Sequence, residues 1–342
     1  WKGFRVSVRW RNEIGGKRKG DMAMQIKEVQ ERSQRICDNM ERVILGKREV
    51  MEYVLAAFLA GGHVLLEDVP GTGKTMLAKS LAASFGMSFK RVQFTPDLLP
   101  SDVTGIHYFN PKTSEFEFRP GGIFSNILLA DEINRATPRT QSSLLECMEE
   151  GQATIDGETM KTGAPFFVIA TQNPVETRGT FPLPEAQLDR FMMKLSMGYP
   201  VEKSELELLR RVVDEGDLLA ELSPVCTHEE FIQMQKACEQ VRVHDLVLGY
   251  VLEIAKKSRE NKNLALGISS RGAIALVRAA RCYAAVTGSE FVAPDMIKKL
   301  APMVLPHRIL LADSYMSGKE PADYIREILG AVAAPTEEAF RA

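Results

Sequence analysis

The sequence has few cysteines and no long apolar run. Its five cysteines, among 342 residues, lie far apart and form no Cys-x-x-Cys pair. This spacing favours the reduced thiols of a cytoplasmic protein over a disulfide framework or a zinc site. No stretch approaches the roughly 20 consecutive apolar residues that a membrane-spanning helix needs, so we expect no membrane span.

The sequence also has little net charge and few aromatic residues. Its 43 Lys and Arg residues nearly balance 45 Asp and Glu residues, and aromatic residues make up 7% of the chain. This composition speaks against broad nucleic-acid binding, which uses basic surfaces and aromatic stacking platforms, although it does not exclude a local basic patch. With 45% apolar and 26% charged residues, the chain has the composition of a globular protein of about two domains.

The first twenty residues differ from the rest of the chain. They carry many Lys and Arg residues against a single Glu13, have no apolar core of signal-peptide length, and do not begin with methionine. Met22 or Met24 would be a natural start. We therefore expect residues 1–23 to be a basic extension that is disordered or foreign to the native protein, and we assign it no function.

Residues 63–75 carry the strongest motif of the sequence. The apolar run at 64–66 predicts a buried strand. A loop with Gly71 and Gly73 follows, and a helical pattern begins at Lys74. Strand, glycine loop, Lys-Thr and helix together form a phosphate-binding loop, in which backbone N–H groups and the helix N-terminus hold phosphate oxygens.

Two residues of this loop have different expected roles in binding a nucleotide. Lys74 would place a positive charge on the β- and γ-phosphates, and Thr75 would offer a hydroxyl to Mg²⁺. The usual motif begins with glycine five residues before the final Gly-Lys, and Asp68 stands there in this chain. The core of the motif at 70–75 is intact, so we expect nucleotide binding to survive.

Two further apolar runs end in polar residues. The run at 127–130 leads into Asp131 and Glu132, and the run at 166–171 leads into Gln172 and Asn173. Because strands alternate with helices up to about residue 200, the pattern predicts a mainly parallel, three-layer sheet that binds ligands at the carboxyl ends of its strands. The sequence therefore predicts that these residues converge with the phosphate loop on one edge.

The chain divides into parts of different character. Two hairpins are expected, at 107–118 around Asn110-Pro111 and at 153–160 around Asp156-Gly157. After residue 200 the strand signal stops and helical patterns begin, with predicted caps at Thr227, Asp245 and Ser270. We expect an extension at 1–23, an α/β core at 24–199 with a five-stranded sheet and hairpin inserts, an all-α domain at 200–330 and a tail at 331–342.

The polar residues after the strands fit nucleotide hydrolysis. Asp131 would hold Mg²⁺, because this hard cation prefers carboxylate oxygen, and Glu132 would act as general base on the attacking water. An ordinary acidic turn is the alternative. Asn173 would orient the water or contact the γ-phosphate, or it could simply be a turn residue before Pro174.

Two other segments carry weaker signals. The turn Val43-Ile44-Leu45-Gly46, just upstream of the phosphate loop, either joins two helices or forms the wall of an adenine pocket. Gln93 ends the second predicted strand. From that position it could hydrogen-bond Glu132 and hold it inactive until a partner binds.

Five stretches resemble the MoxR family of AAA+ ATPases. They are LEDVPGTGKT at 66–75, LADEINRA at 129–136, ATQNP at 170–174, LPEAQLDRF at 183–191 and ISSRG at 268–272. The resemblance covers roughly residues 24–329 and implies an AAA+ P-loop NTPase core followed by a helical lid domain. Some members of the family have aspartate at the position of Asp68.

The resemblance assigns roles to residues of this chain. It makes Asp131 and Glu132 the Walker B pair and Asn173 the sensor 1 residue. It also makes Arg190 an arginine finger for the neighbouring subunit and Arg271 the sensor 2 residue, which closes the lid above this subunit's own nucleotide. The expected catalytic residues are Glu132, Asn173, Arg190 and Arg271. The expected metal ligands are Thr75 and Asp131. The expected nucleotide contacts are Val43, Gly46, Asp68, Val69, Pro70, Gly71, Thr72, Gly73, Lys74, Thr75 and Met76.

The residues alone leave the two arginines ambiguous. Arg190 could pair with the nearby Glu185 or Asp189, and Arg271 could be a solvated residue in the first turn of a helix. Against this stands the chemistry of the guanidinium group, whose planar fork suits the charge on γ-phosphate oxygens during phosphoryl transfer.

The resemblance also implies a function. We expect a Mg²⁺-dependent ATP hydrolase that forms a homo-oligomer, a hexameric ring, and acts in a chaperone-like way on a partner protein. In this family the partner is often a von Willebrand factor A-domain protein, and the insert at 95–122 is implicated in such contacts. The alternatives are a nucleic-acid-stimulated AAA+ motor, the ATPase subunit of a metal-chelatase-like complex, and a non-catalytic nucleotide-dependent scaffold.

Overall fold

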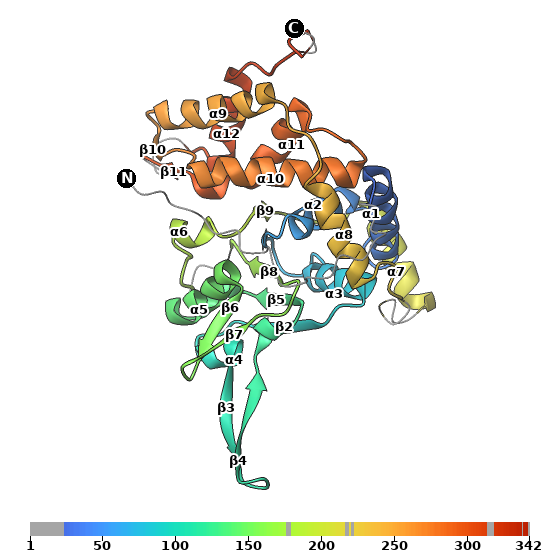
Figure 1. Cartoon of the computed structure of the whole chain (residues 1–342), viewed down its shortest axis with the longest axis vertical. Coiled ribbons are helices and arrows are strands. Elements are labelled where there is room, and N and C mark those ends of the chain that lie inside the picture. Colours follow the sequence, from blue (N-terminus) through green and yellow to red (C-terminus); the bar gives the residue numbers. More distant parts are fainter. Residues whose placement is uncertain are drawn as a thin grey trace, which may run out of the picture.

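The computed structural model describes residues 24–175, 179–215, 219, 222–312, 318–336 and 338–340. The predicted extension at 1–23 lies outside them. Figure 1 shows an α/β core with a long hairpin projecting from one end and a group of helices packed against the other.

A five-stranded parallel sheet forms the centre of the core, as predicted. Its strands are β1 (Val64–Glu67), β2 (Phe89–Gln93), β5 (Ile127–Asp131), β8 (Phe167–Gln172) and β9 (Met193–Leu195), in the order β2-β5-β8-β1-β9. The register sets Gln93 opposite Asp131 and Glu67 opposite Gln172. The polar residues after these strands therefore meet at the carboxyl edge of the sheet.

Helices cover both faces of the sheet and make three layers. The helices α1 (Ile26–Glu41), α2 (Arg48–Leu59) and α3 (Lys74–Phe85) share one apolar cluster with Ile127 and Leu129 of β5. The neighbouring β5 residues Leu128 and Ala130 belong to a second cluster with α5 (Pro138–Glu150). This alternation follows from the two-residue period of a strand, and it explains why the strands read as continuous apolar runs.

Several short elements decorate the core. The β3 (Gly105–Asn110) and β4 (Glu115–Pro120) hairpin follows α4 (Pro100–Thr104) and projects away from the body in Figure 1. The second predicted hairpin is β6 (Gln152–Ile155) with β7 (Glu158–Lys161). The remaining pieces are the 3₁₀ turns η1 (Gly122–Phe124) and η2 (Ile133–Arg135) and the single-turn helix α6 (Glu185–Leu188). The sequence patterns did not predict α4 and α6.

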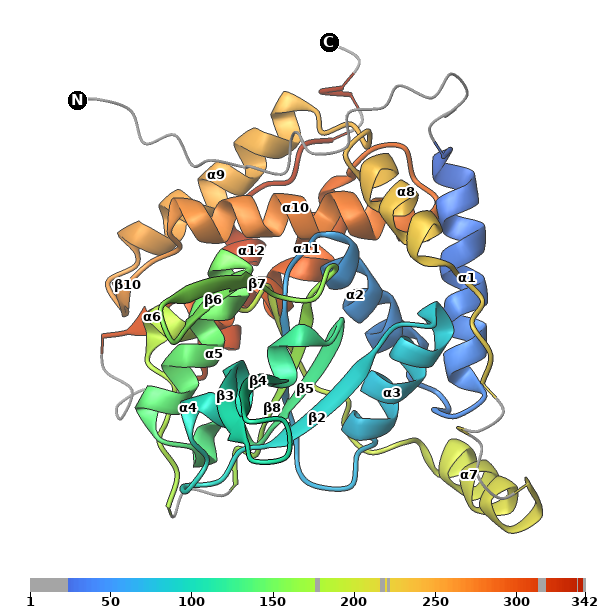
Figure 2. The same cartoon turned by 60° about the horizontal axis from the view of Figure 1, so that its bottom comes forward.

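The chain after residue 200, which we call the lid, is mainly helical. It contains α7 (Glu202–Glu215), α8 (His228–Cys238), α9 (Asp245–Glu260), α10 (Ser270–Thr287), α11 (Pro294–Val304), the turn η3 (Pro306–Arg308) and α12 (Pro321–Ala331). A short ribbon of β10 (Leu264–Leu266) and β11 (Leu310–Leu311), which the sequence did not predict, joins two of its loops. In Figure 2, α10 lies across α2, and α7 stands apart at the edge of the molecule.

Two of the predicted helix caps are wrong by one residue. Thr227 caps α8 as expected, but His244 caps α9 and Ser269 caps α10, in place of Asp245 and Ser270. The side chain of His244 accepts from the N–H of Leu246, and the Ser269 hydroxyl accepts from the N–H of Gly272. Each cap is thus the extended residue whose side chain can reach the free N–H groups of the first turn.

Over the described part of the chain, no helix has the length and apolarity that crossing a membrane requires.

Candidate active site

The phosphate loop joins β1 to α3. Gly71 and Gly73 have φ angles of 87° and 89°, a left-handed conformation that glycine adopts without strain. Lys74, the first residue of α3, donates from Nζ to the carbonyls of Asp68 at 2.8 Å and Val69 at 2.9 Å. Partial burial lowers the pKa of Lys74, while nearby carboxylates act in the opposite direction.

Asp131 lies at the end of β5 with its carboxylate held from two sides. Thr171 of β8 donates its hydroxyl to Oδ1 at 2.6 Å. Arg91 of β2 donates to Oδ2 from Nη2 at 2.6 Å and from Nε at 3.0 Å. Asp131 is 9% exposed, so this buried charge is paired and hydrogen-bonded as a buried carboxylate must be.

Glu132 occupies an unusual backbone conformation. Its φ of 55° and ψ of 51° lie in the left-handed region, which is uncommon for residues other than glycine. Its N–H donates to the Thr171 hydroxyl at 2.8 Å. Its Oε2 accepts from Gln93 Nε2 at 2.9 Å and from Arg135 Nη1 at 3.0 Å. The contact with Gln93 is the one that the sequence analysis suggested.

Asn173 directly follows β8 at the same edge of the sheet. Its Oδ1 accepts from the N–H of Val175 at 3.1 Å, which is the local bond of a turn. The structure thus shows the turn, while the position at the carboxyl end of β8 also fits the sensor role. Both interpretations of Asn173 are compatible with this geometry.

The turn at 43–46 lies beside the segment that leads from the core to the lid. Val43 is buried, and Gly46 has a φ of 71°. A Cβ atom on Gly46 would stand 2.7 Å from the Ser204 hydroxyl in the first turn of α7. Lys47 donates to two carbonyls of the segment that precedes α7, those of Met197 and Tyr199. This turn therefore contacts the beginning of the lid.

Arg190 and Arg271 come together on one carboxylate. Glu149, at the end of α5, accepts from Arg190 Nε at 3.0 Å and from Arg271 Nη2 at 3.0 Å. Arg271 also lies 3.4 Å from Asp189, whose other oxygen pairs with Arg308 at 2.7 Å. The suggested local pairing of Arg190 with Glu185 or Asp189 is replaced by one with a residue 41 positions away.

This arginine pair lies at the amino edge of the sheet, opposite the phosphate loop. His63, the residue before β1, bonds the carbonyl of Met148 at 3.1 Å, and its own carbonyl accepts from the N–H of Met192 at 2.7 Å. Burial lowers the pKa of His63 to about 4, so the ring is neutral at pH 7 and can make the first bond as a donor. Glu149 and Arg190 adjoin these residues. They are separated from the loop by the length of β1, which is roughly 13 Å at about 3.3 Å per residue.

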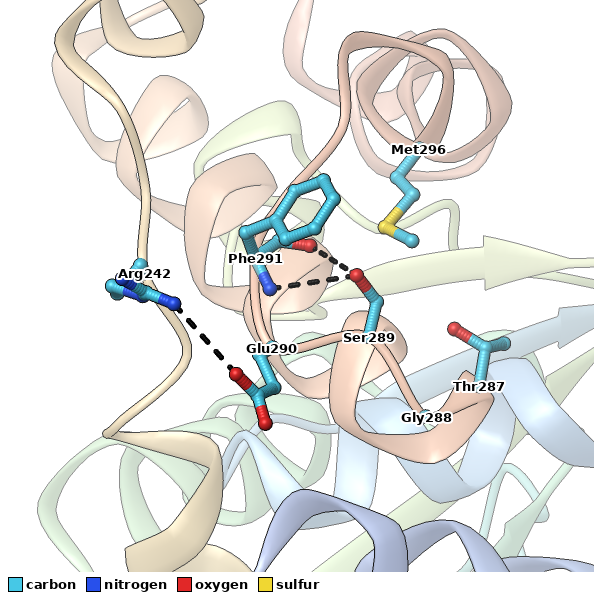
Figure 3. A pocket seen from close by; sticks show the side chains of 7 residues that line it. All are labelled: Arg242, Thr287, Gly288, Ser289, Glu290, Phe291 and Met296. Atoms are coloured by element: carbon cyan, nitrogen blue, oxygen red, sulfur yellow. Dashed lines mark hydrogen bonds and ion pairs between the residues drawn. The ribbon is translucent and has the colours of Figure 1, made fainter.

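A surface hollow in the lid is unrelated to these residues. It has a volume of about 690 Å³ and lies between the end of α10 and the start of α11. Figure 3 shows Phe291 and Met296 on its wall and the ion pair of Arg242 with Glu290, 3.6 Å apart, at its rim. The phosphate loop and the Asp131–Glu132 pair belong to the core, so the hollow is not part of the candidate site.

Sequence reasoning missed four residues that shape the site. Arg91 could have been found, because it lies two positions before Gln93 and therefore on the same side of β2. The other three are Thr171, Lys47 and Glu149. Thr171 stands in the ATQNP stretch, but nothing in the sequence assigned it a bond to Asp131. Lys47 and Glu149 carry no local signal, since their partners are distant in the chain.

Comparisons with known proteins agree with this geometry. The family model described as ATPase family associated with various cellular activities (AAA) matches residues 63–193, and an AAA lid domain model matches residues 256–328. Chaperone MoxR1 of Mycobacterium tuberculosis (strain ATCC 25618 / H37Rv) is 37% identical over 306 residues, which is 86% of this chain and 80% of the relative. The chain belongs to the MoxR family of AAA+ ATPases.

Other similar proteins extend the likeness over most of the chain. The uncharacterized protein YeaC of Bacillus subtilis (strain 168) is 52% identical over 301 residues, covering 88% of this chain and 94% of YeaC. A crystal structure from Cytophaga hutchinsonii ATCC 33406, described as that of an ATPase, superposes with a TM-score of 0.84 at 36% identity. The match covers 90% of this chain and 96% of the other. The predicted AAA+ core with a helical lid is thus confirmed for this MoxR-family protein.

Proposed function

We propose that this MoxR-family protein hydrolyses ATP to ADP and phosphate, and that it uses the energy to remodel a partner protein. One observation carries the proposal. The phosphate loop with Lys74 and the Asp131–Glu132 pair lie on neighbouring parts of one sheet edge, and Glu132 is held in a strained backbone conformation. Strain of this kind concentrates at functional sites, because the surrounding structure must hold it in place.

The residues at the carboxyl edge of the sheet have roles that follow from their chemistry. The N–H groups of the loop and of the first turn of α3 donate to phosphate oxygens, and the ammonium of Lys74 neutralises their charge. Glu132 takes a proton from the attacking water, which makes it the general base. Asn173 orients that water or contacts the γ-phosphate. The turn at 43–46 forms one wall of the space for the adenine.

The oxygen atoms at this edge fit a magnesium ion. Thr75 would supply a hydroxyl and Asp131 a carboxylate, and both are the hard ligands that Mg²⁺ prefers. When bound with the nucleotide, the ion offsets the negative charge on the phosphate oxygens. Asp131 is already held in place through Oδ1 by Thr171. Arg91 must then share or release the Oδ2 atom.

The two arginines support a site shared between subunits. Arg190 and Arg271 lie together at the amino edge, so neither is placed to reach the phosphate loop of its own chain. A neighbouring copy in a ring would bring both to that loop by a head-to-tail contact, the kind that closes into a ring. We therefore propose a homo-oligomer, a hexameric ring, in which both arginines act on the next subunit's nucleotide. For Arg271 this replaces the role in its own subunit that the sequence led us to expect.

The projecting hairpin supports a partner-binding role. Phe109 and Phe116, near its tip, are 52% and 73% exposed, and their rings lie 5.6 Å apart edge to face. Exposed paired aromatics of this kind are typical anchors of protein interfaces. We propose that the β3–β4 hairpin binds a von Willebrand factor A-domain protein. We also propose that this MoxR-family protein acts as a chaperone on that partner, and that it does so in the cytoplasm. A nucleic-acid motor and a chelatase subunit have less support, since no feature of the described surface favours either.

The proposal is tested with two variants of the full chain. In Lys74→Ala, loss of the phosphate-binding charge should raise the dissociation constant for ATP by about a hundredfold or more. In Glu132→Gln, ATP should bind normally while turnover falls by at least about a hundredfold, because the general base is gone. Fluorescent-nucleotide titration and phosphate release measure the two effects. Full turnover in Glu132→Gln would overturn the assignment.

A further inference from the structure

Asp68 stands where the phosphate-loop motif usually has glycine, and the structure shows what its side chain contacts. The residue is 6% exposed. Its N–H donates to the carbonyl of Gln172 at 3.2 Å, which continues the β1–β8 pairing by one residue. The backbone of Asp68 is thus fixed by the sheet, and its carboxylate is buried beside the chain that leaves β9.

Three donors converge on this carboxylate. They belong to residues 196–201, the core–lid connector, which leads from β9 to α7. Oδ1 accepts from the Ser196 hydroxyl at 2.7 Å and from the N–H of Gly198 at 3.1 Å. Oδ2 accepts from the N–H of Met197 at 2.5 Å. Since all three partners donate, a carboxylate satisfies them, whereas an amide would oppose one donor with another.

The core–lid connector is held from its other side by Lys47. This lysine, the residue before α2, donates to the carbonyl of Met197 and to that of Tyr199, the latter at 2.8 Å. The Asp68 carboxylate therefore accepts from N–H groups of the connector, and the Lys47 ammonium donates to its carbonyls. The connector is clamped between the phosphate loop and the turn at 43–46.

Asp68 also contacts the nucleotide-binding lysine through its backbone. The carbonyl of Asp68 accepts from Lys74 Nζ at 2.8 Å. At the far end of the loop, the Met197 methyl carbon lies 3.8 Å from the position that a Cβ on Gly73 would take. The connector therefore bonds the loop at Asp68 and lies close to it at Gly73.

We propose that Asp68 is a positioning residue that fastens the core–lid connector to the phosphate loop, so that the lid responds to nucleotide binding. Glycine at this position has no side chain and could make none of the three bonds. The aspartate is then a functional replacement within the motif rather than a defect of it. This inference rests on the proposed ATPase function, because it concerns regulation of the same site.

The test compares Asp68→Gly and Asp68→Asn with the unchanged full chain. Hydrogen exchange at the amides of Met197 and Gly198 reports the bonds directly, with and without ADP. In Asp68→Gly both amides should exchange about tenfold faster or more, and ADP should no longer change their exchange. The turnover number should fall by about tenfold while the dissociation constant for ADP shifts less than about threefold, since the rest of the loop is intact.

Ser196→Ala is the matched control, because it removes one of the three bonds and keeps the negative charge. In Ser196→Ala and in Asp68→Asn, hydrogen exchange at the two amides should be faster than in the unchanged chain and slower than in Asp68→Gly. Exchange in Asp68→Gly equal to that of the unchanged chain would overturn the proposal. A chain that binds no nucleotide would instead reject the proposed function, and exchange measured without ADP would still decide whether Asp68 holds the connector.

Discussion

Two side chains of β2 hold the two acidic residues of the candidate site. Arg91 binds Asp131 through Oδ2, and Gln93 binds Glu132 through Oε2. Arg91 also donates to Gln93 Oε1 at 2.9 Å. This bond fixes the orientation of the Gln93 amide, so that its nitrogen faces Glu132. Both carboxylates are therefore restrained by one strand at the edge of the sheet.

The restraint on Glu132 predicts a gain of activity. In Gln93→Ala the carboxylate loses a hydrogen bond that competes with the attacking water. The basal ATPase rate should then rise about two- to tenfold, since hydrogen bonds to charged groups contribute roughly 1.5–3 kcal/mol and Gln93 is solvent-exposed. Stimulation by a partner should shrink accordingly. Steady-state phosphate release with and without the partner measures both.

Lys90→Ala provides the control for this variant. Lys90 lies on the same strand but points to the other side, where it donates to the carbonyl of Pro120 at 3.3 Å. Its ATPase rates should equal those of the unchanged chain. If Gln93→Ala also left the basal and stimulated rates unchanged, the restraint would have no role in regulation.

Individual residues also show how far sequence alone could go. Asp131, Glu132 and Lys74 were predicted together because each follows or begins an apolar element, and the register of parallel strands brings such positions to one edge. The partner of Arg190 could not be predicted in this way. Glu149 reaches it only because α5 runs back along the sheet and ends at the amino edge.

At the scale of elements, strands and long helices followed from apolar periodicity, whereas short elements did not. The helix α4 has five residues and α6 has four, too few to show a helical period. The β10–β11 ribbon is held by tertiary contacts between two lid loops. The β3–β4 hairpin was predicted from its turn, but it extends two residues further at each end than the apolar pattern did.

The exposed aromatic residues of the β3–β4 hairpin indicate where a partner binds. In a chain carrying Phe109→Ser and Phe116→Ser, the affinity for the proposed von Willebrand factor A-domain partner should fall by about tenfold or more, because exposed aromatic anchors dominate interface energies. Basal ATPase activity should not change, since the tip is remote from the phosphate loop (Figure 1). Calorimetric titration of partner into protein measures the affinity.

A second hairpin serves as the control. Thr154 and Thr159 face each other across β6 and β7, and their replacement by alanine should leave partner binding intact. Equal affinity of the Phe109/Phe116 variant and the unchanged chain would contradict the assignment of the β3–β4 hairpin as the docking site.

At the scale of the whole molecule, the proposed active-site residues are divided between the two edges of the sheet. The carboxyl edge carries the phosphate loop, Asp131 and Glu132, and the amino edge carries Arg190 and Arg271. One chain cannot bring the two edges together, because the sheet lies between them. The proposed hydrolysis therefore depends on neighbouring copies, and on both arginines acting on the next subunit.

Mixing inactive subunits tests this dependence most directly. Arg190→Ala and Glu132→Gln chains should each be nearly inactive alone. In an equal mixture, roughly a quarter of the interfaces of a ring would join an intact Glu132 to an intact Arg190, and a similar share of the unchanged activity should return. Arg271→Ala should behave like Arg190→Ala. Phosphate release that stays at the level of the separate variants at every mixing ratio would contradict a shared site.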